Sequence, residues 1–180
     1  LGSGGTSNGD STVYIKGAFG KLTMGDVGGA PDALVGQTSG VGYGPNDGLH
    51  EIGYLGTDKT AAYYEYSTGA LTFGVGAGQT GDGGLNDNLN VAVKYAAGDY
   101  SVAVGYEDSA TDSHLTVGGS AKFGSATVKA RLSDFDSDPD LNYSLSVDFA
   151  VSGATITAFY TDFGGAGLAG ARVRVPRNVH

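Results

Sequence analysis

The 180-residue sequence contains no cysteine, no tryptophan and a single methionine. Without cysteine it has neither a disulfide framework nor a thiolate zinc site. It also lacks any run of about 18 consecutive apolar residues, the length that a membrane-spanning helix requires. A membrane location stays open, because a closed β-barrel crosses a bilayer without such a run.

Basic residues are scarce: ten Lys and Arg stand against 19 Asp and Glu, a net charge of −9. Nucleic acid is therefore not an expected partner, since its binding requires a basic face. Proline is also rare, with four residues, whereas glycine is abundant, with 33. The glycines follow no collagen-like triplet, and an aromatic content of 10% argues against disorder. The composition indicates a folded, glycine-rich domain.

Apolar and polar residues alternate with a period of two along most of the chain, and helical periodicity is hard to find. The pattern predicts about eleven strands, at 12–18, 21–26, 60–67, 70–78, 89–97, 99–107, 114–122, 125–133, 141–150, 154–162 and 167–175. At about 3.3 Å per residue and a tilt near 45°, strands of this length span an apolar band of roughly 20–25 Å.

The predicted connections alternate in length. Very short links occur at Phe19–Gly20, Thr68–Gly69, Gly98–Asp99, Gly124–Ser125 and Ser152–Gly153. Between them lie longer polar loops, at 27–59, 79–88, 108–113 and 135–140. Short turns at one rim and long loops at the other are typical of an up-and-down barrel in an outer membrane. The expected fold class is therefore an all-β, antiparallel up-and-down transmembrane β-barrel.

The two faces of each predicted strand differ in polarity. In 141–150, one face is apolar and the other carries Asn, Ser and Asp. A soluble barrel would turn the apolar face inward, whereas a membrane barrel turns it to lipid. Aromatic residues gather near both strand ends, which favours two interfacial girdles, although tyrosine also has a high strand propensity.

One segment carries a family resemblance: "VYIKGAFGKLTMGDVGGAPDALVG", residues 13–36, in which two strands flank a "GAFGK" turn and lead into a long loop. The hairpins "YEYSTGALTFGVGAG" and "VAVKYAAGDYSVAVGYE" add to it. Over residues 12–175 the chain resembles the general diffusion porins of Gram-negative bacteria, of the alphaproteobacterial sixteen-stranded type.

The resemblance implies a water-filled outer-membrane channel for passive diffusion of ions and small hydrophilic solutes. It implies contact with the lipid bilayer and lipopolysaccharide, a homotrimer in the full-length form, and no enzymatic activity. Segment 27–59 would be the loop that folds into the barrel and narrows it. Its acidic residues are Asp32, Asp47, Glu51 and Asp58.

Charged residues of the predicted strands fall on the polar face by alternation. As pore-wall residues we expect Glu65, Lys94, Lys122, Lys129, Arg131, Arg172 and Arg174. An acidic loop facing a basic wall would set up a transverse electric field that screens solutes, as the resemblance implies. The plainer interpretation is that these charges only keep a surface solvated.

The sequence also departs from the family pattern. About eleven strands are predicted where such porins have sixteen, so we expect an incomplete barrel from a fragment. The expected organisation is a flexible segment 1–11, a barrel portion 12–175 and an irregular end 176–180.

The alternative is a soluble secreted β-roll or β-sandwich, rich in Gly and Asp, that binds Ca²⁺. It rests on "GDGGLNDNL" and on the carboxylates of "DFDSDPD", namely Asp134, Asp136, Asp138 and Asp140. The second motif lacks the glycine and glutamate of an EF-hand loop, and a solvated loop is the favoured interpretation of it. No other cofactor is expected, and the chain has no GxSxG or HExxH motif of a hydrolase.

Overall fold

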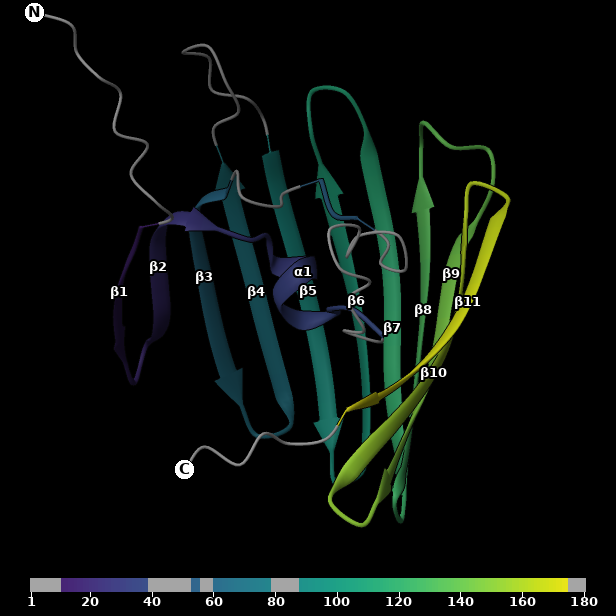
Figure 1. The fold of residues 1–180 in the computed structure, drawn as a ribbon. Coiled ribbons are helices and arrows are strands. Elements are labelled where there is room, and N and C mark those ends of the chain that lie inside the picture. The colour runs from purple at the N-terminus through teal and green to yellow at the C-terminus, as the bar shows by residue number, and fades with distance from the viewer. Residues whose placement is uncertain (1–10, 39–52, 56–59, 79–87, 175–180) are drawn as a thin grey trace, which may run out of the picture.

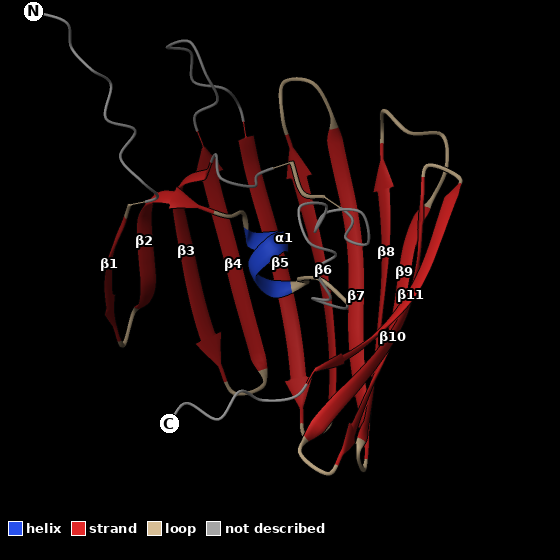
Figure 2. Cartoon of the chain, viewed as in Figure 1, coloured by secondary structure: helices blue, strands red, loops and turns tan. Residues whose placement is uncertain are grey.

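The computed structural model describes residues 11–38, 53–55, 60–78 and 88–174. Within these ranges the chain forms one curved eleven-stranded sheet and one short helix (Figures 1 and 2). Every strand pairs antiparallel with the next strand along the chain. The predicted all-β up-and-down architecture is confirmed. A single antiparallel sheet is neither a β-roll nor a two-sheet sandwich.

The strand boundaries agree with the predicted ones to within one or two residues. The strands are β1 Thr12–Gly17, β2 Gly20–Val27, β3 Thr60–Thr68, β4 Leu71–Gly78, β5 Asn88–Ala97, β6 Tyr100–Asp108, β7 Ser113–Phe123, β8 Ala126–Phe135, β9 Asn142–Val151, β10 Ala154–Phe163 and β11 Ala166–Arg174. The helix, α1, spans Ala30–Leu34 and lies on the concave side of the sheet (Figure 1). No helix among the described residues has the length and hydropathy to cross a bilayer.

Two-residue turns close the hairpins at one end of the sheet. In the β9–β10 turn both residues have positive φ, 43° for Ser152 and 80° for Gly153, which suits the right-handed twist of the flanking strands. Two turns lie one residue away from their predicted positions. The first is at 18–19 instead of 19–20, because Gly17 pairs with Gly20, and the second is at 69–70 instead of 68–69, because Thr68 pairs with Leu71. The β10–β11 turn, Gly164–Gly165, is equally short but lies at the other end, so loop length does not alternate throughout.

Burial is inverted relative to an ordinary soluble domain. Along β6, Val102, Val104 and Tyr106 are 42–52% exposed, whereas Ala103 is 5% exposed and Glu107 is fully buried. The same holds on β9, where the serines and Asn142 are buried and the apolar residues are exposed. We call the exposed apolar side the outer face and the other side the inner face. Large apolar side chains that are exposed in contiguous patches indicate a surface that contacts lipid or another protein.

Aromatic side chains of the outer face lie toward both ends of the strands. Tyr66, Tyr95 and Tyr100 are exposed near the two-residue turns, and Tyr106 and Tyr143 are exposed near the opposite end. This is the placement predicted from the sequence. Amphipathic rings at two levels are typical of the two membrane–water interfaces.

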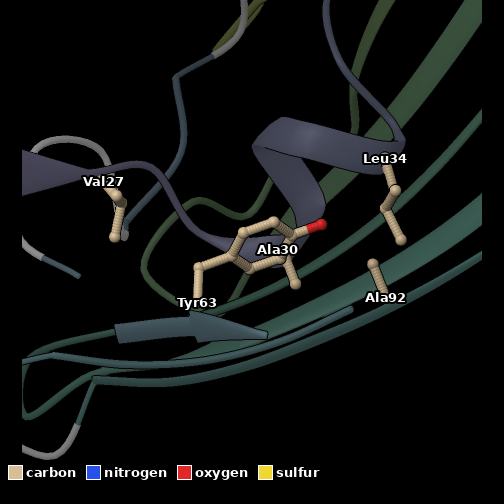
Figure 3. Close-up of a cluster of buried hydrophobic side chains, with 5 residues drawn as sticks. All are labelled: Val27, Ala30, Leu34, Tyr63 and Ala92. Carbon is tan, nitrogen blue, oxygen red and sulfur yellow. The ribbon is translucent and has the colours of Figure 1, made fainter. Parts of the chain in front are cut away.

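The only apolar cluster of buried residues in the described part lies on the inner face, under α1. It consists of Val27, Ala30, Leu34, Tyr63 and Ala92 (Figure 3). Leu34 points toward Ala92, and the Tyr63 ring lies beside Ala30 (Figure 3). The helix was not predicted, because five residues give no periodic signal and are too short to be stable alone. Packing against the sheet supplies its stability.

Candidate functional site: the covered inner face

Glycines of the inner face make room for residues 28–38, which we call the inner segment. A Cβ atom added to Gly105 would lie 2.7 Å from Pro31, and one added to Gly118 would lie 2.7 Å from Val35. Both distances are shorter than real carbon contacts, so a side chain at either position would displace the segment. The missing side chains therefore let the backbone of the wall and the inner segment approach each other closely.

The inner segment is attached to the wall at both of its ends. The Ala30 backbone N–H, at the start of α1, donates to Oδ1 of Asn90 over 2.7 Å. At the far end, the Thr38 hydroxyl donates to Ser144 over 3.0 Å, and Ser146 donates to the Thr38 carbonyl over 2.7 Å. The segment thus crosses the inner face from β5 to β9. All of these wall side chains are buried, so the bonds are shielded from water.

Arg131 on β8 joins the wall to two separate parts of the loop. Its guanidinium donates to Oε1 of Gln37 over 2.8 Å and to the Gly53 carbonyl over 3.2 Å. Within the sheet, its Nε donates to the hydroxyls of Thr116 and Ser133 over 3.2 and 3.1 Å. The side chain is 2% exposed, and its planar fork suits several simultaneous acceptors.

Residues Gly53–Leu55, which we call the return segment, lie against the same region. The Tyr54 hydroxyl donates to the Gly36 carbonyl over 2.7 Å, which ties the return segment to the inner segment. The Leu55 N–H donates to Oε2 of Glu107 over 2.8 Å, and Asn88 donates to the Leu55 carbonyl over 3.4 Å. Wall side chains therefore bind both peptide groups that flank Leu55.

Glu107 and His114 form a fully buried pair on neighbouring strands. Nδ1 of His114 lies 3.2 Å from Oε2 of Glu107. We assign the proton to Nδ1, because Oε2 of Glu107 accepts from the Leu55 N–H and then acts as the acceptor in both contacts. The imidazole is stacked on Phe135, with ring centres 4.0 Å apart and planes at 3°. Its other nitrogen, Nε2, is buried without a hydrogen-bond partner in the described part of the chain.

A cavity of about 250 Å³ lies between the inner segment and the wall. Three basic side chains line it: Lys94, Lys129 and Arg131. Nζ of Lys129 lies 3.1 Å from Oδ2 of Asp148, and both side chains are partly exposed. Serines and glycines of β6 and β7 form much of the remaining wall. The cavity is therefore polar, positively charged on the wall side and able to hold water or a small anion.

Residues 2–174 match the sequence profile described as Gram-negative porin. A porin from Rhodobacter capsulatus is 37% identical over 152 residues, which is 73% of this chain and 50% of that protein. The chain belongs to the Gram-negative porin family. This membership places it in the bacterial outer membrane and agrees with the resemblance to alphaproteobacterial porins. The porin chain spans about half the length of this curated relative.

Solved structures give the same fold. OmpT of Vibrio cholerae with its loop L8 deleted superimposes with a TM-score of 0.66 at 17% identity, over 91% of this chain and 66% of that one. A mutant of the Rh. blastica porin gives a TM-score of 0.53 at 16% identity, over 95% of this chain and 78% of that one. The eleven described strands form an open sheet, consistent with the predicted incomplete barrel.

The predicted acidic loop residues are only partly described. Asp32 lies in the first turn of α1 and is half-buried. Asp47, Glu51 and Asp58 lie outside the described residues. The acidic side of the predicted field therefore stays a prediction.

The predicted wall residues have different surroundings in the structure. Glu65 accepts a 2.8 Å hydrogen bond from the Tyr63 hydroxyl, and Lys122 is exposed near the β7–β8 turn. Lys94, Lys129 and Arg131 come together at the cavity. Arg172 and Arg174 pair in register with Thr157 and Thr155 on β10, and their side chains are outside the described part.

Sequence reasoning missed several inner-face residues. Lys16 and Lys21 are directly opposite each other on β1 and β2, and Lys21 is also paired in register with Glu65. Alternation along residues 12–26 carried this signal. Glu107 and His114 also alternate onto the polar face, but their pairing depends on a cross-strand register that the sequence does not show.

Two of the four aspartates predicted for Ca²⁺ accept hydrogen bonds from neighbouring residues. Asp136 accepts from the Ser113 hydroxyl over 2.7 Å, and Asp138 accepts from the Asp140 N–H over 3.0 Å. Asp134 is paired in register with Leu115 on the exposed side. Among the residues described, no group of three or more His, Asp or Glu side chains is arranged to hold a metal ion.

Proposed function

We propose that this chain forms part of the wall of a water-filled channel for passive diffusion of ions and small hydrophilic solutes. The observation that carries the proposal is the inverted burial, with apolar side chains exposed outward and Ser, Thr, Asn, Arg and Glu buried inward. Apolar side chains that face outward are suited to contact with lipid, and polar side chains that face inward are suited to a hydrated lumen. Residues 12–175 are the barrel portion in this proposal.

The proposed constriction is segment 27–59. Its inner segment crosses the concave face from β5 to β9, held by Asn90, Arg131 and the two serines of β9. A loop fixed across the inner face of a barrel occupies part of the cross-section and limits solute size. Short glycine-lined contacts keep it close to one side of the wall, which leaves the rest of the cross-section for water.

The proposed selectivity comes from charge on the two sides of the opening. Lys94, Lys129 and Arg131 line the wall side, and Asp32 with Asp47, Glu51 and Asp58 would supply the loop side. Opposed charges create a transverse field that orders water and dipolar solutes. Arg172 and Arg174 would extend the basic wall along β11, and Lys122 and Glu65 would lie nearer the short-turn rim.

The proposed partners are those of an outer-membrane channel: the lipid bilayer, lipopolysaccharide at the long-loop side, and two further copies in a homotrimer of the full-length protein. Each outer-face aromatic girdle would lie at one headgroup level. We propose no enzymatic role.

Planar-bilayer recording tests the proposal. The full-length protein, added in detergent to both electrolyte compartments, is expected to produce stepwise, ohmic conductance increments. A matched control is a preparation unfolded in urea and diluted without lipid or detergent. Absence of increments from folded protein contradicts the channel function. A protein that stays folded and monomeric after complete removal of detergent contradicts the lipid-facing assignment.

A further inference from the structure

Three wall side chains hydrogen-bond to the backbone of the three-residue return segment, Gly53–Leu55. Arg131 donates to the Gly53 carbonyl, Glu107 accepts from the Leu55 N–H, and Asn88 donates to the Leu55 carbonyl. The Tyr54 ring is bounded by the Arg131 guanidinium at 4.0 Å and by the His114 ring at 5.7 Å.

Glu107 lies at the centre of these contacts. Its Oε2 accepts from the return segment, and its Oε1 would lie 2.7 Å from a Cβ added at Gly29, so it also adjoins the inner segment. A carboxylate fully buried on a channel wall is costly unless it is hydrogen-bonded. Glu107 lies between the inner segment and the return segment, so the hydrogen bond with the return segment offsets part of the cost of burying its carboxyl group.

His114 fixes the orientation of Glu107. Its Nδ1–H binds the same oxygen that receives the Leu55 N–H, and its stacking on Phe135 restricts rotation of the ring. A hydrogen bond from a positioned ring limits the rotamers open to the carboxylate. We propose that Glu107, oriented by His114, is the positioning residue that holds the return segment against the wall and so sets the width of the opening. This inference deepens the proposed channel function and rests on it for its consequence.

A spin-label experiment tests the attachment without relying on transport. The chain has no cysteine, and a Cβ added at Gly53 meets no atom of the described residues within 4 Å, so a nitroxide on Gly53→Cys is the reporter of the return segment. The full-length labelled protein is measured in lipid vesicles by continuous-wave EPR. Four backgrounds are compared: parent, Glu107→Leu, Glu107→Gln and Asp148→Asn.

Loss of the buried acceptor of the Leu55 N–H is expected to raise the ratio of detached to attached return segment by about 10- to 100-fold. Glu107→Leu should therefore increase the mobile component of the spectrum relative to the parent. Glu107→Gln keeps a carbonyl acceptor for the Leu55 N–H and should restore most of the immobilised signal. Asp148→Asn removes an inner-face carboxylate that binds Lys129 and Thr157, and should leave the spectrum unchanged.

His114→Phe provides a second route, since it keeps a ring for Phe135 and removes the Nδ1–H donor. It should give a smaller rise in the mobile fraction and serves if Glu107→Leu fails to fold. Unchanged spectra in both variants would overturn the proposal.

Single-channel records of the same proteins distinguish the attachment of the return segment from the channel function. If the parent conducts, Glu107→Leu should show greater open-channel noise than parent and Asp148→Asn. If the parent forms no channel, the channel function fails while the EPR result still decides the attachment.

Discussion

The guanidinium carbon of Arg131 lies 4.0 Å from the centre of the Tyr54 ring, and Nη1 of the same group donates to Gln37 over 2.8 Å. One wall side chain thus contacts residues 17 positions apart in the loop. The guanidinium carbon lies over the ring while the guanidinium nitrogens make the hydrogen bonds, so one group makes both kinds of contact at once. Arg131 is therefore a structural link between wall and loop as well as a fixed charge at the cavity.

Replacing Arg131 separates these two roles. Arg131→Lys keeps the charge but loses the planar fork, so we expect selectivity close to the parent with more conductance noise. Arg131→Ala removes both and should also lower anion preference and cost about 1.5–3 kcal/mol of stability. Reversal potentials and single-channel noise in a KCl gradient measure the two effects. Equal noise in parent and Arg131→Lys would argue against the structural role.

The glycine contacts predict a steric effect of a single methyl group. Gly105→Ala places a Cβ 2.7 Å from Pro31, and we expect a loss of about 1–3 kcal/mol from overpacking. The matched control is Gly53→Ala, whose Cβ meets no atom of the described residues within 4 Å. Urea unfolding in vesicles, followed by tyrosine fluorescence, compares the two. Equal stability of both variants would mean that the inner segment does not pack against β6 in the membrane.

If the outer face contacts lipid, the stability cost of placing a charge on it should depend on the depth of the residue in the bilayer. Val104 lies mid-strand on β6 and is 45% exposed, so Val104→Arg should cost about 2–4 kcal/mol in a bilayer. Phe123 ends β7 beside a two-residue turn, and Phe123→Arg should cost about 0–1 kcal/mol for the charge at the interface. Equal costs for these two arginines would contradict a lipid-facing band centred on the strands.

Lys129 and Asp148 predict selectivity shifts of opposite sign. Their 3.1 Å contact is partly exposed, so removing either should change stability by less than about 1 kcal/mol. Asp148→Asn leaves Lys129 uncompensated at the cavity and should increase anion preference. Lys129→Gln should decrease it. Reversal potentials measured at two salt concentrations check this, because screening should reduce both shifts. Unchanged reversal potentials in both variants would place these charges away from the conducting path.

The fold could be predicted because its signal is local. Alternation within each strand defines the two faces without knowledge of any partner, and two-residue turns fix which strands pair. The helix α1 escaped prediction for the opposite reason. It is a single turn stabilised by Tyr63 and Ala92, residues 30 to 60 positions away in the chain.

The site could be predicted only where a strand position was enough. Alternation placed Lys129 and Arg131 on the inner face, but it did not reveal that Arg131 binds Gln37 and the Gly53 carbonyl. The Glu107–His114 pair depends on the register of β6 against β7, which alternation within each strand does not reveal. Gly74 on β4 is a further example, because a Cβ added there would lie 3.0 Å from the Tyr63 side chain and 3.1 Å from Ala30, contacts that a single strand pattern does not reveal.

The central claim, apolar face to lipid and polar face to water, is tested most directly by cysteine labelling at adjacent positions of β6. Ser101 lines the cavity and Val102 is 52% exposed on the outer face, and the chain has no cysteine of its own. In vesicles containing the full-length protein, a charged, membrane-impermeant thiol reagent should modify Ser101→Cys rapidly and Val102→Cys slowly, and a lipid-soluble reagent should reverse the order. Rapid modification of Val102→Cys by the charged reagent, with Ser101→Cys protected, would contradict the account.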